Sequence, residues 1–147
     1  MSVHQPLADI RVIELGTSVA APYGTWILAT LGAEVIKVER PETGDDCRQW
    51  GPPSVKEGTR SFFLTLNANK KSVVVDFTDK SQIDRLRRYI IENVDVVVQN
   101  LRPGLVEKFG LSADDLMPEN PRLIYCHSGA FGNAGPYKER PGYDPLM

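Results

Sequence analysis

IRVIELGTSVAAPYGTWILATLGAEVIKVER, residues 10–40, decides the fold of this 147-residue chain. Its first part, residues 10–15, is a short and largely β-branched run, typical of a strand that is covered on both faces. Pro22 suits the first position of a helix, where its missing N–H has no partner to lose, and Gly32 suits the position just past a helix end. Residues 35–38 begin a second strand. The stretch therefore predicts a right-handed, parallel βαβ unit.

The predicted helix carries residues at helical spacing along one face, and such a stripe normally faces the core. The stripe consists of Tyr23, Trp26, Ile27, Thr30 and Leu31. Ligands of open α/β sheets bind beyond the carboxyl ends of the strands. In this stretch those ends are residues 16–20 and the pair Glu39 and Arg40.

Composition and charge exclude several classes of protein. The net charge of −2 shows no basic excess, so nucleic acid is not an expected partner. No run of about 18 apolar residues indicates a transmembrane helix, and residues 1–6 contain no apolar segment of a secretion signal. Cys47 and Cys126 form no close pair, which favours a cytoplasmic chain with two unpaired thiols. No cluster of residues has metal-ligand spacing, so we expect no metal.

The rest of the chain continues the alternation of strands and helices, which predicts a parallel α/β fold. Runs of β-branched residues predict strands at 72–77, 95–99 and 123–126. Thr78 or Asp79 can cap the helix between the first two of these. The remaining segments are expected as a long loop at 41–59, a strand or short helix at 60–69, a short helix at 103–110, a capping box at 112–115 and no regular element at 127–144. The length predicts one domain or a piece of a larger one, and the chain stops at Met147 without a closing helix.

The turn at residues 16–22 is the first candidate site. Backbone N–H groups at the start of a helix can meet an anion, although a plain turn is an equally good interpretation. The sequence is not G-x-G-x-x-G, so the dinucleotide fingerprint is absent. Glu39 lies about 20 residues after the turn, where a ribose-binding acid would lie. Without the glycines, a solvated charge at a strand end is the better interpretation of Glu39.

Polar residues at other element ends are further candidates, each with a structural alternative. Arg40, Lys70 and Lys71 could bind a phosphate, or they could lie on an exposed, solvated face. Asp76 and Asn100 follow strands, where they could line a crevice or form turns and helix caps.

Several motifs stand together in one order along the chain. They are LADIRVIEL with AAP, LGAEVIKVERP, GDDxRxWGPP, NxNKKS, DVVVQNLRPG and GPYKERPGYD. In this combination the sequence resembles the N-terminal part of the family III CoA-transferases, which include formyl-CoA, carnitine and bile-acid CoA-transferases and the α-methylacyl-CoA racemases. The resemblance begins at Leu7 and extends over the rest of the chain.

This resemblance implies a Rossmann-like parallel sheet with flanking helices, in which residues 1–147 form part of the large domain and bind coenzyme A. It also implies an acyl-CoA and a carboxylic acid as substrates, and an interlocked homodimer of the full-length protein. Strand-end backbone would read adenine, Arg40 and Lys108 would meet phosphates, and Asn100 would bond the pantetheine amides. The residues that match family contacts to coenzyme A are Val19, Ala20, Arg40, Val75, Asp76, Phe77, Thr78, Asn100, Leu101, Arg102, Lys108, Arg140, Pro141, Gly142 and Tyr143.

The resemblance also implies a mechanism in which an aspartate attacks the acyl-CoA thioester and carries the acyl group as an anhydride. That aspartate is expected beyond Met147, and Asp144 matches a flanking position instead. Racemases that resemble this chain carry His where Tyr143 stands, and a phenol is a poor base at neutral pH, so a transferase is favoured. The GDDxRxWGPP motif is most similar to members that use dicarboxylic acids such as succinate or glutarate. The alternatives are a racemase fragment and a non-catalytic nucleotide-binding or interaction module.

Overall fold

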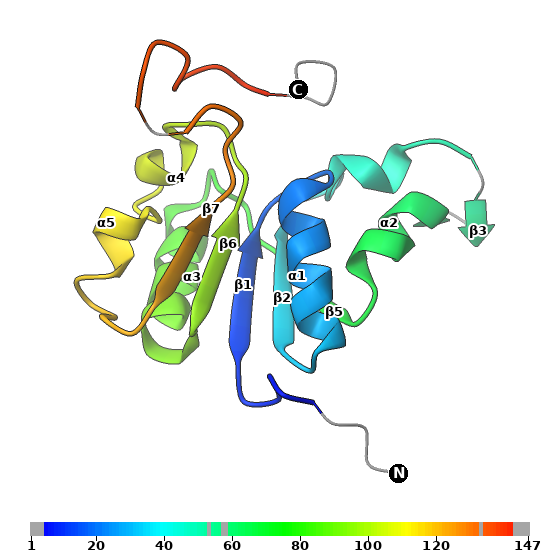
Figure 1. Cartoon of the computed structure of the whole chain (residues 1–147), viewed down its shortest axis with the longest axis horizontal. Helices are drawn as coiled ribbons and strands as arrows, with labels where there is room; N and C mark the ends of the chain where they lie inside the picture. The colour runs from blue at the N-terminus through cyan, green and yellow to red at the C-terminus, as the bar shows by residue number, and fades with distance from the viewer. Residues whose placement is uncertain (1–4, 53, 57–58, 133, 143–147) are drawn as a thin grey trace.

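A five-stranded parallel sheet forms the centre of the molecule (Figure 1). The computed structural model describes residues 5–52, 54–56, 59–132 and 134–142. The sheet has the order β5-β2-β1-β6-β7, and every neighbouring pair is parallel. Its strands are β1 (Arg11–Leu15), β2 (Glu34–Glu39), β5 (Lys70–Val74), β6 (Val96–Gln99) and β7 (Ile124–His127). Counted along the chain this is the order 3-2-1-4-5 of a Rossmann-like doubly wound sheet, so the predicted fold class is confirmed.

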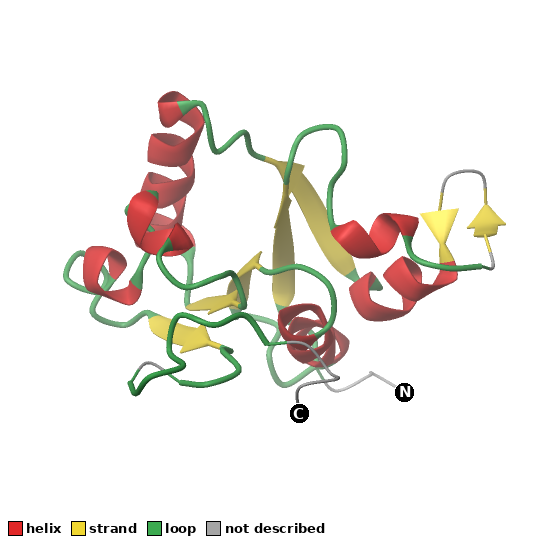
Figure 2. Ribbon diagram, turned by 90° about the horizontal axis from the view of Figure 1, so that it is seen from above, coloured by secondary structure: helices red, strands yellow, loops and turns green. Residues whose placement is uncertain are grey.

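Helices cover both faces of the sheet (Figure 2). One core cluster joins α3 to Ile13 and Val97, and the other joins α1 to Val12 and Val98. Successive residues of a strand point to opposite faces, so these alternating contacts place α1 and α3 on opposite sides of the sheet. The helical elements are α1 (Ala20–Thr30), η1 (Asp46–Gln49), α2 (Ser61–Asn67), α3 (Lys80–Asn93), α4 (Leu105–Lys108) and α5 (Ala113–Leu116).

Local sequence signals account for where several elements begin and end. Asp79 caps α3 by accepting a hydrogen bond from Ser81 N, and Ser112 with Asp115 forms the predicted capping box of α5. Gly32 follows α1 with a φ of 104°, a conformation that glycine adopts without strain. These signals confirm the predicted starts of α3 and α5 and the predicted end of α1.

The segments between β2 and β5 carry more structure than the sequence predicts. The expected loop at 41–59 contains η1 and the strand β3 (Ser54–Lys56), which pairs antiparallel with β4 (Thr59–Arg60). The ambiguous segment at 60–69 is mostly the helix α2. Strand β5 ends at Val74, so residues 75–77 lie beyond its carboxyl end. Figure 1 shows α2 and β3 on the β5 side of the sheet, away from α4 and α5.

The predicted inward face of α1 is wrong. Tyr23, Ile27 and Leu31 are 51%, 40% and 41% exposed. The face on the sheet is made instead of small side chains, which let the helix approach the strands closely. These buried residues are Ala21, Pro22, Thr25 and Ala29. Pro22 is also the third helical residue rather than the first, because α1 begins at Ala20.

No helix among the described residues has both the length and the apolar character that a membrane span requires.

Replacing one isoleucine in each major helix tests which helix face is buried. Ile90 of α3 is fully buried, whereas Ile27 of α1 is 40% exposed. We expect Ile90→Ala to lower the free energy of unfolding by about 2–5 kcal/mol, because it leaves a cavity in the core. Ile27→Ala should lower it by about 1 kcal/mol or less. Urea denaturation of both variants measures this, and equal losses would contradict the orientation of α1.

Candidate functional site

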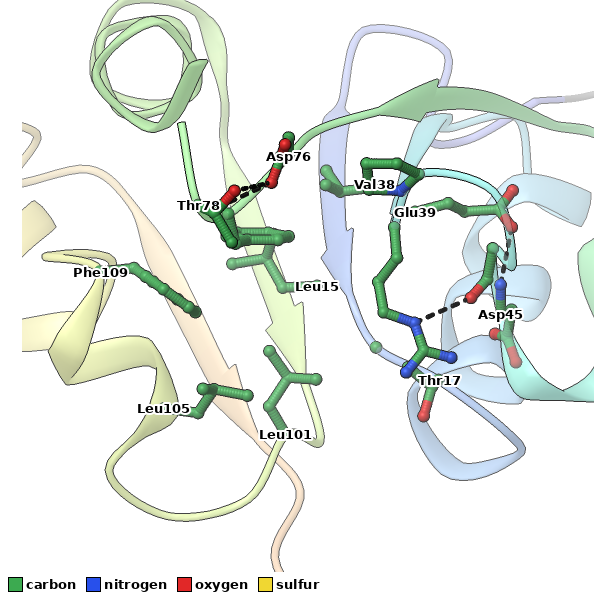
Figure 3. Close-up of a pocket in the computed structure, with 15 residues that line it drawn as sticks. Leu15, Thr17, Val38, Glu39, Asp45, Asp76, Thr78, Leu101, Leu105 and Phe109 are labelled. Atoms are coloured by element: carbon green, nitrogen blue, oxygen red, sulfur yellow. Dashed lines mark hydrogen bonds between the residues drawn. The ribbon is translucent and has the colours of Figure 1, made fainter. Parts of the chain in front are cut away.

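A cavity of about 370 Å³ opens at the carboxyl ends of β1, β2 and β6. This is the end of an open α/β sheet where ligands bind, and the strand order reverses between β1 and β6. Figure 3 shows Leu101, Leu105 and Phe109 on one side of the cavity and Glu39 with Asp45 on the other. The cavity thus has an apolar wall from the β6–α4 region and a polar wall from the end of β2.

Five of the predicted coenzyme A contacts line this cavity, namely Arg40, Asp76, Phe77, Thr78 and Leu101. The ring of Phe77 lies 4.9 Å from that of Phe109, measured between centroids, and this pair forms part of the apolar wall. The short segment after β5 therefore reaches the same crevice as the β6–α4 loop, although the two are distant in sequence.

The other predicted contacts do not line the cavity. Val75 is buried in the core, and Lys108 is exposed with its Nζ 6.0 Å from the Phe109 ring. Arg140 stacks on Tyr137, with its guanidinium carbon 4.5 Å from the ring centroid. Further predicted contacts outside the cavity lining are Val19, Ala20, Asn100, Arg102, Pro141 and Gly142. Tyr143 lies outside the described residues.

Asn100 joins the two sides of the switch point. Its Oδ1 accepts from Thr17 N and its Nδ2 donates to Thr17 O, both at 3.0 Å. Gly16 leaves room for this contact, since a Cβ there would lie 2.9 Å from Asn100 Oδ1 and 2.4 Å from the Ala21 Cβ. The Asn100 amide thus fixes the turn after β1 to the end of β6.

Arg40 and Asp76 lie at the edge of the cavity with partners of their own. The half-exposed guanidinium of Arg40 pairs with Asp46 and donates to Gly44 O at 3.1 Å. Asp76 Oδ1 accepts from Thr78 N at 2.8 Å and from Thr78 Oγ1 at 2.7 Å. Both interpretations offered for Asp76 therefore hold: its side chain forms a turn, and the residue also lines the crevice.

Sequence reasoning missed a buried group of charges beneath the turn at residues 16–20. Lys37 Nζ lies 2.5 Å from Glu14 Oε1, 2.6 Å from Asp45 Oδ2 and 3.0 Å from Gly16 O. Lys70 Nζ lies 2.8 Å from Glu14 Oε2, and all four charged side chains are at most 2% exposed. The signal was present, because Glu14 and Lys37 are charges inside apolar strands and the register pairs them.

The ionisation of this group follows from its geometry. Burial opposes the charge on Lys37, but Glu14 and Asp45 outweigh it and raise the pKa of the Lys37 ammonium. Burial likewise opposes the charge on Asp45, but Lys37 and the donors of Cys47 lower the pKa of the Asp45 carboxyl. For Lys70 burial prevails over Glu14 and lowers the pKa. Within the described part of the chain no donor forms a hydrogen bond with Asp45 Oδ2, so its contact with Lys37 is an ion pair.

The solvated strand-end charge predicted for Glu39 is wrong. Glu39 is 4% exposed, and Arg48 binds both of its carboxylate oxygens at 2.6 and 2.7 Å. Ser72 Oγ and Asp45 N also donate to it. Burial opposes its ionisation, but these donors outweigh burial and hold the pKa of Glu39 at about 2. With both oxygens engaged, Glu39 is not placed to bind the hydroxyls of a ribose.

The two lysines predicted as phosphate-binding candidates, Lys70 and Lys71, differ in their burial. Lys70 is buried against Glu14, whereas the Lys71 side chain is 72% exposed and pairs with Glu34. The exposed-face interpretation therefore holds for Lys71 and is wrong for Lys70. Among the described residues, no group of His, Cys, Asp and Glu side chains is arranged to hold a metal ion.

The strand order defines a doubly wound α/β domain with a crevice at its switch point. Comparison with known families then identifies the class more closely. The model of "CoA-transferase family III" matches residues 7–147, and the chain belongs to this family.

Relatives and solved structures agree with this assignment. The chain is 41% identical to the succinyl-CoA:glutarate CoA-transferase of Mus musculus, with 97% of this chain and 32% of that protein covered. It is also 41% identical to the succinate–glutarate CoA-transferase of Agrobacterium fabrum, with 97% and 36% covered. A crystal structure of a CAIB/BAIF family protein from Brucella suis matches with a TM-score of 0.91 and 42% identity, covering 98% of this chain and 38% of that one. The chain thus spans about a third of the length of these relatives.

The pH dependence of stability tests the pair that the buried Glu39 carboxylate forms with Arg48. Because the folded-state pKa of Glu39 is about 2 against an ordinary value of 4.5, the ionised pair stabilises the fold above about pH 4.5. This contribution, at most about 3 kcal/mol, should be lost as the pH falls from about 4.5 to about 2. We therefore expect the difference in unfolding free energy between wild type and Glu39→Gln to shrink over this range.

Chemical denaturation at several pH values measures that difference. Glu92→Gln, at an exposed position of α3, is the matched control. The same pH dependence in both variants would contradict the role of Glu39.

Proposed function

We propose that the crevice holds part of coenzyme A, and that residues 1–147 contribute the N-terminal coenzyme A site of a CoA-transferase. The observation that carries this proposal is a cavity at the switch point of a family III chain, lined by Arg40 and by the segment after β5. The same geometry disfavours a dinucleotide, since Glu39 is engaged by Arg48 and the glycine fingerprint is absent.

The apolar wall suits a purine ring. Phe77 and Phe109 offer aromatic faces to such a ring. The backbone of Phe77, between the engaged amides of Asp76 and Thr78, would offer a donor and an acceptor for its edge. The cavity volume of about 370 Å³ is that of a small-molecule site, so the rest of the cofactor would extend along the rim.

Cations near the rim would meet the phosphates of the cofactor. Arg40 lies at the cavity, half-exposed, where a phosphate can replace its Asp46 partner. Lys108 is the last residue of α4 and directly precedes Phe109 of the apolar wall. Its side chain is exposed and can reach a phosphate that lies outside the cavity. Val19 and Ala20, which follow the turn between β1 and α1, would contact the part of the cofactor that extends beyond the cavity.

The proposed reaction moves coenzyme A from an acyl-CoA to a second carboxylic acid. An aspartate carboxylate outside these 147 residues attacks the thioester carbonyl, so that an acyl-aspartyl anhydride forms and the thiolate leaves. The thiolate then attacks the aspartyl carbonyl, releasing the first acid and leaving an aspartyl-CoA thioester. The acceptor acid repeats these two steps in reverse. Relatives named for succinate and glutarate support dicarboxylic acids as substrates.

The proposal includes an interlocked homodimer of the full-length protein in the cytoplasm. The exposed apolar stripe of α1, with Tyr23, Ile27 and Leu31, supports an additional protein surface against this face. Cys47 and Cys126 are both unpaired, which is in keeping with a reducing compartment.

Calorimetry with two ligands tests the cofactor assignment. We expect this chain to bind coenzyme A at least about tenfold more tightly than NAD. Arg40→Ala should weaken coenzyme A binding by about tenfold, the size of one charge-assisted hydrogen bond. Arg122→Ala, an exposed arginine away from the cavity, serves as the control. Tighter binding of NAD would remove the coenzyme A assignment.

Isotope exchange in the full-length protein tests the reaction. We expect coenzyme A to pass from succinyl-CoA to labelled glutarate, with no exchange of the α-proton of a 2-methylacyl-CoA for solvent deuterium. Mass spectrometry of the thioesters measures both. Rapid α-proton exchange without transfer would instead assign the protein to the racemase branch.

A further inference from the structure

The turn between β1 and α1 contains a residue in a conformation that its side chain disfavours. Ser18 has a φ of 65°, in the left-handed region that non-glycine residues rarely occupy. Such a conformation persists only where surrounding contacts hold it, and it is common at functional sites. Ser18 directly precedes Val19 and Ala20, where α1 begins.

One side chain accounts for this conformation. Asp45 Oδ1 accepts a hydrogen bond from Ser18 N at 3.0 Å, across 27 residues of sequence. On the other side of the turn, Thr17 N is held by Asn100. Two successive backbone amides are therefore fixed by side chains from two different parts of the chain.

The Asp45 carboxylate is itself held in place. It is 2% exposed, and its second oxygen lies 2.6 Å from Lys37 Nζ. Lys37 is fixed by Glu14 and by Gly16 O, and Glu14 in turn accepts from Thr25 of α1 at 2.5 Å. The acceptor for Ser18 therefore cannot move without disturbing β1, β2 and α1 together.

The N-terminus of α1 has no side-chain cap in this arrangement. Val19 is the N-cap residue but makes no side-chain cap, and the first turn contains no acidic residue. The anionic group near this turn, Asp45, is directed at Ser18 N rather than at the amides of the helix. Those amides therefore depend on the turn for their direction, and a part of the cofactor that extends beyond the crevice to Val19 and Ala20 would be their partner.

We propose that Asp45 is a positioning residue for coenzyme A binding: with Lys37 behind it, its carboxylate holds Ser18 in the left-handed conformation and thereby fixes the backbone of Val19 and Ala20. The inference rests on the proposed function, since those two residues are assigned to the cofactor there. The competing role is purely local, because Asp45 Oδ1 also accepts from Cys47 N and caps η1.

A double-mutant cycle separates these two roles. Glycine adopts a positive φ without strain, so a glycine at position 18 needs Asp45 less than serine does. We expect Asp45→Ala to weaken coenzyme A binding by about tenfold in the wild-type background, the size of one lost charge-assisted hydrogen bond. In the Ser18→Gly background the same substitution should weaken it by about threefold or less, by the same conversion. An equal loss in both backgrounds, or no loss in either, would overturn the proposal.

A second pair of variants leaves Asp45 intact, in case Asp45→Ala does not fold. A β-branched residue resists the left-handed region, so Ser18→Val should bind coenzyme A more weakly than Ser18→Gly by about tenfold. Asp114→Ala, at an exposed position on α5, is the control for loss of an acidic residue. Equal affinities of the valine and glycine variants would overturn the proposal.

Hydrogen exchange of the ligand-free chain distinguishes failure of this inference from failure of the proposed function. Absence of coenzyme A binding by the wild-type chain would overturn the proposed function and the inference that rests on it. The Ser18 amide should be protected in the wild-type chain and should exchange at least about tenfold faster in Asp45→Ala, because it loses its buried acceptor. Equal protection in both would overturn the positioning role even where coenzyme A binds.

Discussion

The arrangement of β1, β2, α1 and the turn between β1 and α1 depends on the ammonium of Lys37. This ammonium pairs with two buried carboxylates, Glu14 and Asp45, and donates to the backbone at Gly16, while Lys70 supplies the second positive charge of the group. Removing charges from water is costly, and a buried ion pair often contributes little net stability. What such a group does provide is a constraint on geometry. Displacement of Lys37 leaves the buried Asp45 carboxylate without its cation, and displacement of Glu14 leaves the Lys70 ammonium without its anion. Here that geometry connects β1, β2, α1 and the segment before η1.

A second ion pair, whose carboxylate is buried, extends this constraint from β2 to η1 and α2. Glu39 binds Arg48 of η1, and the Arg48 guanidinium lies 3.8 Å from the centroid of the Phe63 ring in α2. The segment from η1 to α2 is thus anchored to the sheet through charge and cation–π contacts. The acid at the end of β2, which a dinucleotide site would use for ribose, is an internal structural residue here, and Arg40 is the group at the rim that remains suited to an anion.

Most strands of the sheet and their parallel direction could be predicted from the sequence because their signals are local. Runs of β-branched residues, the caps at Asp79 and Ser112, and the βαβ connections each act within a few residues. The orientation of α1 could not be predicted in this way. Its larger apolar residues suggested a core face, but close packing on the sheet selected the alanines and Thr25 instead. The buried charges escaped prediction for a related reason: whether a lysine in a strand is solvated depends on partners that come from other elements.

In the candidate site, too, some residues could be predicted from local signals and others depend on partners distant in sequence. The segment after β5 and Leu101 follow strand ends, and the parallel sheet places them in one crevice. Asp45 lies in a stretch that resembles an ordinary polar loop, and its role depends on Ser18 and Lys37, which are distant in sequence. A residue of this kind becomes visible only when the contacts are known.

Alternation along the two central strands explains why the cavity has an apolar floor beside a polar wall. In β2, Val35, Lys37 and Glu39 point to the face covered by α1 and α2, whereas Val38 points to the α3 face and lines the cavity. In β1, Glu14 and Leu15 divide in the same manner. One face of the sheet thus ends in charges, of which Glu39 and Asp45 also reach the polar wall of the crevice, and the other face ends in its apolar floor. A shift of one residue in the register would exchange the two faces, placing Leu15 among the ions and Glu14 in the apolar floor, so the buried ion pairs also enforce the register on which the site depends.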